Sequence, residues 1–112
     1  MKKPEEGQLL RIFLSENESY HGRPLYEAIV KQARNLHLAG ATVIRGIMGY
    51  GADSRIRTTK VLRLSDNMPM IVEIVDSAEK IQEILPFLDE HVKNGLITLE
   101  NIRVIRYQHD KK

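Results

Sequence analysis

The sequence contains no cysteine and no tryptophan, and its few aromatic residues, two Phe and four Tyr, are scattered. Without cysteine the chain has no disulfide bonds, no thiolate nucleophile and no cysteine metal ligand, which suits a reducing cytoplasm. Without an aromatic-rich basic strand it does not fit RNA-recognition domains, so we expect no nucleic-acid partner. No apolar run approaches the roughly 20 residues of a membrane span, and no hydrophobic signal region follows residues 1–6. We therefore expect a cytoplasmic protein without membrane insertion.

The length and composition fit one globular domain. The chain has 112 residues, of which 42% are hydrophobic and 29% are charged, with a formal net charge of +2. This length leaves no room for a second core. Residues 1–7 and 108–112 are polar and are predicted to be flexible tails around a domain at 8–107.

Hydrophobic periodicity predicts the order β-α-β-β-α-β. Residues 8–15, 41–48, 70–75 and 96–107 have strand character, whereas apolar residues recur at helical spacing in 25–36 and 81–88. This order matches the ferredoxin-like arrangement, an α+β fold in which two helices cover one face of a four-stranded antiparallel sheet.

Local signals suggest where the helices begin and end. Gly40 is a candidate terminator of the first helix. Asp76, with Glu79 three residues later, resembles a capping box for the second. Pro86 removes a backbone donor inside that helix, so a kink or break is expected near it.

The second face of the predicted sheet is also apolar. By alternation it carries residues that point away from the helices, namely Leu9, Phe13, Ile71, Val75 and Ile105. An uncovered apolar face of this kind usually contacts another subunit, so the residues alone predict an oligomer.

A glycine cluster, Gly46, Gly49 and Gly51, lies where the second strand gives way to a long excursion at 52–69. Glycine lets a backbone approach a phosphate and present N–H groups to it, although a bulge and a turn explain the same residues. The stretch is basic, with Arg45, Arg55, Arg57, Lys60 and Arg63. These cations fit either a phosphate ligand or an ordinary solvated loop. The excursion contains a strand-like piece, 61–64, and is interpreted as partly a hairpin.

Other catalytic and metal chemistries are not supported. His21, His37, His91 and His109 lack metal-ligand spacing, so no metal site is expected. Ser15, Ser19 and Ser54 have no identifiable base, and no carboxylates are paired for acid–base work. We therefore predict that the protein is not an enzyme.

Several motifs resemble known proteins. Thr42-Val43, Gly49-Tyr50-Gly51 with its basic loop, and the ending 103–107 resemble the PII signal-transduction family. The segments 10–17, 22–26 and 39–46 are similar to a prokaryotic family of uncharacterised PII-like proteins, a similarity that spans about residues 8–107.

The resemblance implies a homotrimer with an adenine nucleotide in each cleft between subunits, and with the 52–69 loop docking on a protein partner such as a transporter, channel or enzyme. Positions that are basic in PII proteins fall on Met70, on the short segment 93–96 and on Gln108, so ADP or AMP is expected rather than ATP, and no cofactor is required. The expected nucleotide-binding residues are Thr42, Arg45, Gly46, Gly49, Tyr50, Gly51, Arg55, Arg57 and Arg106. The alternative is a CutA-like trimer with a metal-tolerance or scaffolding role and no nucleotide. A small-molecule enzyme on the same fold is a third class, since fold does not fix function.

Overall fold

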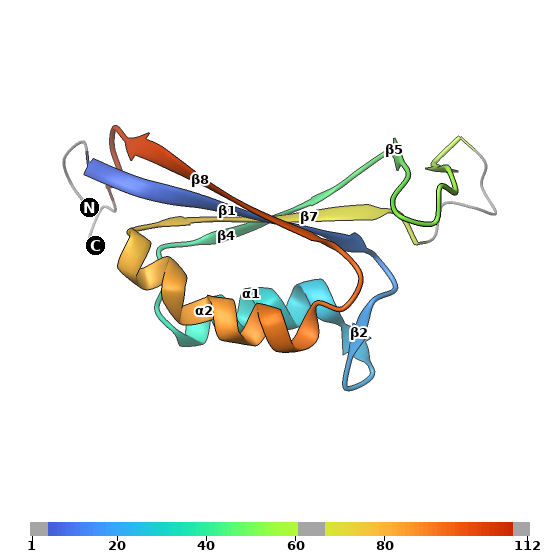
Figure 1. Ribbon diagram of the computed structural model, residues 1–112, viewed down its shortest axis with the longest axis horizontal. Coiled ribbons are helices and arrows are strands. Elements are labelled where there is room, and N and C mark those ends of the chain that lie inside the picture. The colour runs from blue at the N-terminus through green and yellow to red at the C-terminus, as the bar shows by residue number, and fades with distance from the viewer. Residues whose placement is uncertain (1–4, 61–66, 109–112) are drawn as a thin grey trace.

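The computed structural model describes residues 5–60 and 67–108, which form an antiparallel sheet with two helices on one side (Figure 1). The elements in chain order are β1 (Glu5–Ser15), β2 (Ser19–Tyr20), β3 (Arg23–Pro24), α1 (Leu25–Asn35), β4 (Ala41–Arg45), β5 (Met48–Gly49), β6 (Arg57–Thr58), β7 (Pro69–Asp76), α2 (Ala78–His91) and β8 (Leu96–Val104). The main sheet has the order β4-β7-β1-β8, and every neighbouring pair is antiparallel. The predicted ferredoxin-like α+β fold is confirmed.

The core lies between the sheet and the two helices. Alternation along β1 turns Leu10, Ile12 and Leu14 toward the helices, where all three are buried. They pack with one face of β7 and with the apolar stripes of both helices, namely Val72, Ile74, Leu25, Ile29, Ala33, Ile81, Ile84 and Leu88.

Helix α1 ends at Asn35, so the prediction that Gly40 terminates it is wrong. The chain leaves the helix at His37, which has a φ of 62°. The amide of His37 donates to the Arg34 carbonyl at 3.0 Å, and the amide of Leu38 donates to the Ala33 carbonyl at 3.0 Å. This is the Schellman arrangement, in which a left-handed residue satisfies the last carbonyls of a helix.

Helix α2 differs from its prediction at two points. Ser77, and not Asp76, is the N-cap, since its hydroxyl accepts the Lys80 amide at 3.3 Å. The Asp76 carboxylate instead accepts the amides of Ala39, at 2.8 Å, and Ser77, at 2.6 Å. The predicted break at Pro86 is also wrong, because the helix continues to His91.

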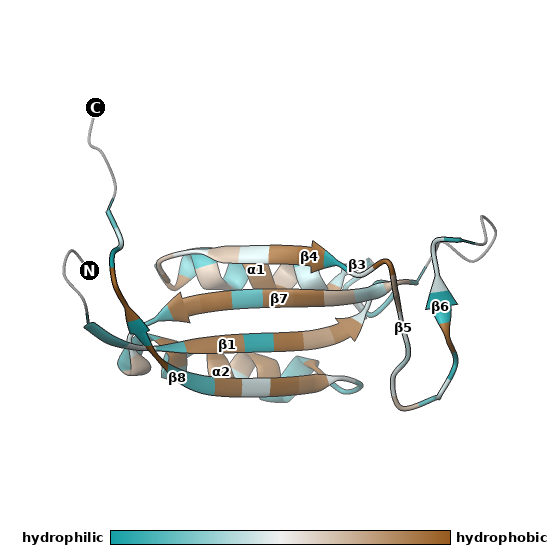
Figure 2. Cartoon of the chain, turned by 90° about the horizontal axis from the view of Figure 1, so that it is seen from above, coloured by the Kyte–Doolittle hydropathy of each residue, from teal (hydrophilic) through white to brown (hydrophobic). Residues whose placement is uncertain are grey.

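Both ends of the described chain are tied to the sheet. Strand β1 begins at Glu5, three residues before the predicted start, because Glu5 pairs with Val104 of β8. After β8 the chain leaves the sheet and crosses toward the β4 side, where the Tyr107 hydroxyl donates to the Ala39 carbonyl at 2.9 Å (Figure 2). Ile105 follows the last residue of β8 and lies outside the paired residues of the sheet, so its predicted place on the second sheet face is wrong.

No helix covers the sheet face opposite α1 and α2 (Figure 2), and the strand register places apolar side chains on it. The pairing register places Leu9 beside Val75 and Phe13 between Ile71 and Leu96 on this face. At its centre Arg11 donates to Glu73 at 2.9 Å and to Glu100 at 2.7 Å, and the first of these hydrogen bonds is the main cause that raises the Arg11 pKa. We call this surface the open face; it combines an apolar periphery with a central ion-pair network.

Strands β5 and β6 form an arm that projects beyond the end of the sheet (Figure 1). The arm exposes large apolar side chains, namely Ile47, Met48, Tyr50 and Ile56. The predicted strand-like piece at 61–64 lies outside the described residues. Within residues 5–60 and 67–108, no helix is long and apolar enough to cross a membrane.

Candidate functional site

Most of the residues predicted to bind a nucleotide lie on the arm: Arg45 and Gly46 at its base, and the others in the β5–β6 hairpin and its connecting loop. Met48 pairs with Thr58, and Gly49 pairs with Arg57. The Thr59 amide also donates to the Ile47 carbonyl at 3.1 Å, which extends the pairing. The glycine cluster and the arginines, which are close to each other in the sequence, are therefore also neighbours in space.

Two of the three glycines are required by their contacts with Pro69, the first residue of β7. A Cβ at Gly46 would lie 2.8 Å from the Pro69 Cγ, and a Cβ at Gly49 would lie 3.2 Å from the same atom. The Gly46 amide donates to the Pro69 carbonyl at 2.7 Å, which explains the close approach. Neither glycine has a positive φ, so close packing and not backbone conformation accounts for them.

Gly51 differs from these two because it lies in open space. Nothing would come within 4 Å of a Cβ at this position, and its φ is not positive. Its carbonyl accepts the Ser54 amide at 2.9 Å in a tight turn. The space beside Gly51 is therefore available to a ligand, and Tyr50 next to it is 72% exposed.

Asp53 offsets part of the positive charge on the arm, which the sequence analysis did not anticipate. One carboxylate oxygen accepts the Arg55 amide at 2.9 Å, and the other accepts a hydrogen bond from the Arg57 guanidinium at 3.4 Å. The Arg55 side chain remains exposed. An Asx turn at Asp53 thus shapes the loop and lowers its net charge.

Arg45 at the end of β4 is engaged by Glu16, a residue that sequence reasoning also missed. Its guanidinium donates to both Glu16 carboxylate oxygens, each at 3.1 Å. Glu16 in turn accepts the Met68 amide at 3.1 Å, and its own amide donates to the Met68 carbonyl at 2.9 Å. We call this group, Glu16, Arg45 and Met68, the loop clasp, because it joins the two ends of the connection between β4 and β7.

The loop clasp lowers the pKa of the Glu16 carboxylate. The hydrogen bond from Arg45 is the largest cause that lowers the Glu16 pKa, burial opposes it, and the Met68 amide adds to the lowering. The carboxylate therefore stays charged when it holds the clasp.

Thr42 and Arg106 lie apart from the arm. Thr42 is on the open face opposite Glu73, at the second residue of β4. Strand β8 ends at the far end of the molecule from the arm (Figure 1). Arg106 follows this strand by two residues and donates to Gln108 at 2.9 and 2.7 Å. A single chain thus brings together the predicted residues from Arg45 to Arg57 but not Arg106. Among residues 5–60 and 67–108, no group of three or more His, Asp or Glu is placed to hold a metal ion.

A family model described as "Uncharacterized ACR, COG1993" matches residues 7–104. The chain belongs to this family, DUF190. A UPF0166 protein of Aquifex aeolicus is 46% identical over 101 residues, which cover 88% of this chain and 92% of that relative. A UPF0166 protein of Methanocaldococcus jannaschii is 37% identical over 102 residues, covering 90% of this chain and 94% of that relative.

Solved structures of PII-like proteins have the same fold as this DUF190 chain. CPII, a nitrogen regulatory PII-like protein from Thiomonas intermedia bound to ADP, AMP and bicarbonate, superposes with a TM-score of 0.66 at 17% identity, covering 95% of this chain and 94% of that one. A protein from Thermus thermophilus described as PII-like gives a TM-score of 0.67 at 19% identity, covering 92% of this chain and 93% of that one. The predicted membership of an uncharacterised prokaryotic family is confirmed, and its fold is the one seen in PII-like proteins.

Proposed function

We propose that this DUF190 protein is a PII-like regulator that binds an adenine nucleotide on the arm, beside Gly51. The observation that carries the proposal is the place of Gly51: an open position beside arginines, on a fold that CPII uses while bound to ADP and AMP. Backbone N–H groups and guanidinium groups are the ordinary protein ligands of phosphate.

The site requires a neighbouring copy of the chain. Three copies that bury their open faces against one another would cover the apolar residues around Leu9, Phe13 and Val75. The same assembly would allow Arg106 of one copy to approach the arm base of the next, which a single chain keeps apart. We therefore propose a homotrimer with a nucleotide in each cleft, located in the cytoplasm.

ADP or AMP is favoured over ATP by the charges at the arm base. Glu16 already holds Arg45, and Asp53 already holds Arg57, so Arg55 is the least engaged of the arginines at 45–57 that the structure describes. Such a site offers little excess positive charge to a third phosphate. We infer that a bound nucleotide changes the 52–69 segment and thereby the docking of a protein partner, with no chemical conversion of the nucleotide.

Calorimetry with ADP, AMP, ATP and adenosine tests the proposal. Gly51→Val is expected to abolish binding, because its side chain fills the space that the phosphates occupy. Gly40→Val is the matched control, since Gly40 also has nothing within 4 Å and lies in the α1–β4 connection. Arg55→Ala should weaken ADP binding more than adenosine binding.

Two results would contradict the proposal. If Gly51→Val binds the nucleotide as tightly as wild type, Gly51 is only part of a turn and does not face the ligand. Absence of wild-type binding to any adenine nucleotide at millimolar concentration would favour the CutA-like alternative. A screen with divalent metals would then follow, because a ligand at 100 times its Kd stabilises a fold by about 2.7 kcal/mol.

A further inference from the structure

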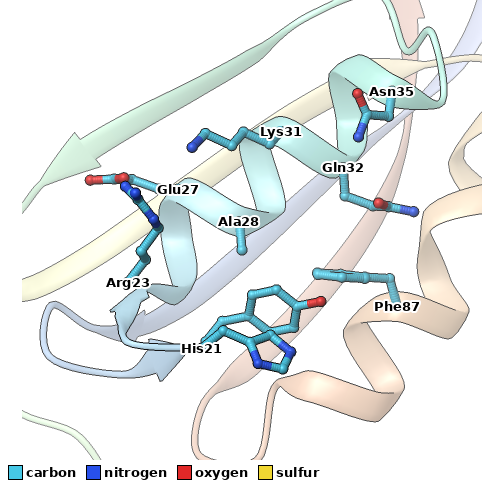
Figure 3. Close-up of a pocket in the computed structure, with 9 residues that line it drawn as sticks. His21, Arg23, Glu27, Ala28, Lys31, Gln32, Asn35 and Phe87 are labelled. Atoms are coloured by element: carbon cyan, nitrogen blue, oxygen red, sulfur yellow. The ribbon is translucent and has the colours of Figure 1, made fainter.

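A hollow of about 290 Å³ lies on the helix side of the molecule, away from the open face. Its walls come from the β2–β3 hairpin, one face of α1 and the side chain of Phe87 on α2 (Figure 3). None of these residues belongs to the proposed nucleotide site, so the hollow needs its own explanation.

The hairpin that forms one wall is held in a strained turn. Tyr20 pairs with Arg23, and the two residues between them, His21 and Gly22, have φ values of 51° and 79°. Two positive φ values are the signature of a type I′ turn, which glycine adopts freely and histidine adopts uncommonly. The turn places Tyr20, His21 and Arg23 together at the rim of the hollow.

Aromatic rings form the floor of the hollow. The Tyr20 ring lies 5.6 Å from Phe87, 4.8 Å from His91 and 4.3 Å from His21, measured between ring centroids. Phe87 and His91 are themselves 4.5 Å apart. Tyr20, His21 and Phe87 line the hollow, and the Tyr20 ring is inclined to the other two by 81° and 59°, so a planar ligand can rest against the face or edge of a single ring.

The polar wall comes from α1. Glu27, Lys31 and Asn35 are spaced by four residues and so share one helix face. Gln32 also lines the hollow, from the neighbouring side of the helix. Gln32 and Phe87 face each other across the opening (Figure 3). Within the described ranges, the side chains of Arg23, Lys31, Gln32 and Asn35 have no hydrogen bond or ion pair in the structure, so their donors are available to a ligand.

We propose that this hollow binds a small planar monoanion of the aromatic carboxylate class. The rings accept the planar part, and Arg23 with Lys31 attracts the carboxylate. Glu27 offsets one of these two cations, which leaves one positive charge for the ligand. The volume lies at the lower end of ligand pockets, about 300 Å³, and so limits the ligand to little more than one ring.

The test is an NMR titration of the ¹⁵N-labelled full chain with 4-hydroxybenzoate. Amide shifts are expected at His21, at Gly22 and along 31–35, with a Kd of a few millimolar for a probe of about ten non-hydrogen atoms. The neutral 4-hydroxybenzamide should bind more weakly because it lacks the charge. Cyclohexanecarboxylate should bind more weakly because it lacks the planar ring.

Charge variants give effects of opposite sign. Lys31→Gln should weaken binding of 4-hydroxybenzoate about two- to fivefold, and Glu27→Gln should tighten it by a similar factor. Phe87→Leu keeps the apolar volume but removes a ring, so it should weaken binding about three- to tenfold. Arg34→Gln is the matched control on the same helix, because Arg34 does not line this hollow, and it should leave the Kd unchanged.

The proposal is overturned if the shifts map elsewhere, if Glu27→Gln and Lys31→Gln change affinity in the same direction, or if the benzamide binds as tightly as the benzoate. Glu27 and Lys31 lie outside the core, so both variants remain folded and these outcomes can be read. The proposal does not rest on nucleotide binding and survives its failure.

Discussion

Removal of the Glu16 side chain is expected to loosen the base of the arm. Glu16→Ala loses two hydrogen bonds from Arg45 and leaves the amide of Met68, a fully buried residue, without its carboxylate acceptor. An unsatisfied buried donor costs about 1–3 kcal/mol, whereas a partly exposed ion pair contributes about 0–1 kcal/mol. The free energy of unfolding should therefore fall by about 2–3 kcal/mol.

Glu16→Gln separates the two contributions. The amide oxygen still accepts from Met68, so the charge toward Arg45 and one of its two hydrogen bonds are lost, and the cost should be about 1 kcal/mol or less. Glu18→Gln is the matched control, because the Glu18 side chain has no hydrogen bond or ion pair to any described residue. Urea unfolding at one fixed protein concentration measures all three variants, and hydrogen exchange of the Met68 amide should accelerate most in Glu16→Ala.

The depressed Glu16 pKa fixes the sign of the pH dependence. A carboxylate whose folded pKa lies below its unfolded value adds stability above the unfolded pKa and loses it as pH falls through the folded pKa. The stability advantage of wild type over Glu16→Gln should therefore shrink as the solution is acidified below about pH 4.3, the ordinary glutamate value. Equal stability of wild type and Glu16→Ala at neutral pH, or an advantage over Glu16→Gln that grows in acid, would refute the clasp.

Two further substitutions test the packing and the assembly. Gly46→Ala should destabilise the fold by about 1–3 kcal/mol, because its Cβ would lie 2.8 Å from Pro69, whereas Gly40→Ala has open space and should be near neutral in thermal unfolding. Phe13→Asp places a charge between Ile71 and Leu96 on the open face, so light scattering should show dissociated or insoluble protein while Asn94→Asp at an exposed turn behaves as wild type. If the wild type is a monomer at micromolar concentration, the proposed trimer is wrong. If Phe13→Asp still forms a trimer, the subunit interface does not include this part of the open face.

The sequence predicted the architecture well because periodicity reports burial directly. The alternation in β1 and the stripe in α2 each require one face to meet a core, and only a few arrangements satisfy both. Element ends were less predictable, since several residue types can fill one backbone role. His37 adopts the left-handed conformation that was expected at Gly40, and Ser77 takes the cap expected of Asp76.

The sequence predicted that the glycine cluster and the arginines are neighbours, but it did not predict the interactions around them. Residue type and spacing located the glycine cluster beside the arginines, and those residues are neighbours in the structure. The partners Glu16 and Met68 are 52 positions apart in sequence, so their contact depends on where β7 begins after the excursion. No local pattern carries that information, and the same holds for the pairing of Arg11 with Glu100 across two strands.

The pairing of β1 with β8 has a consequence for synthesis and folding. Strand β1 lies inside the sheet, yet one of its two neighbours comes from the other end of the chain. Until residues 96–104 have been made, one edge of β1 stays unpaired, and that edge belongs to a segment, 9–14, that is apolar apart from Arg11. Such an edge can pair with a strand of another nascent chain and so cause aggregation. The charge of Arg11 within the segment reduces this risk.

The same pairing makes folding depend on contacts between residues distant in sequence, which slows it. Glu5 and Val104 are paired, so a short linker could join the two ends of the chain. A circular permutant with this linker and with new termini at Gly40, in the α1–β4 connection, would have β8 before β1 in the order of synthesis. Such a permuted chain would make the β1–β8 pair a local hairpin, and we expect it to refold faster and aggregate less than the natural order.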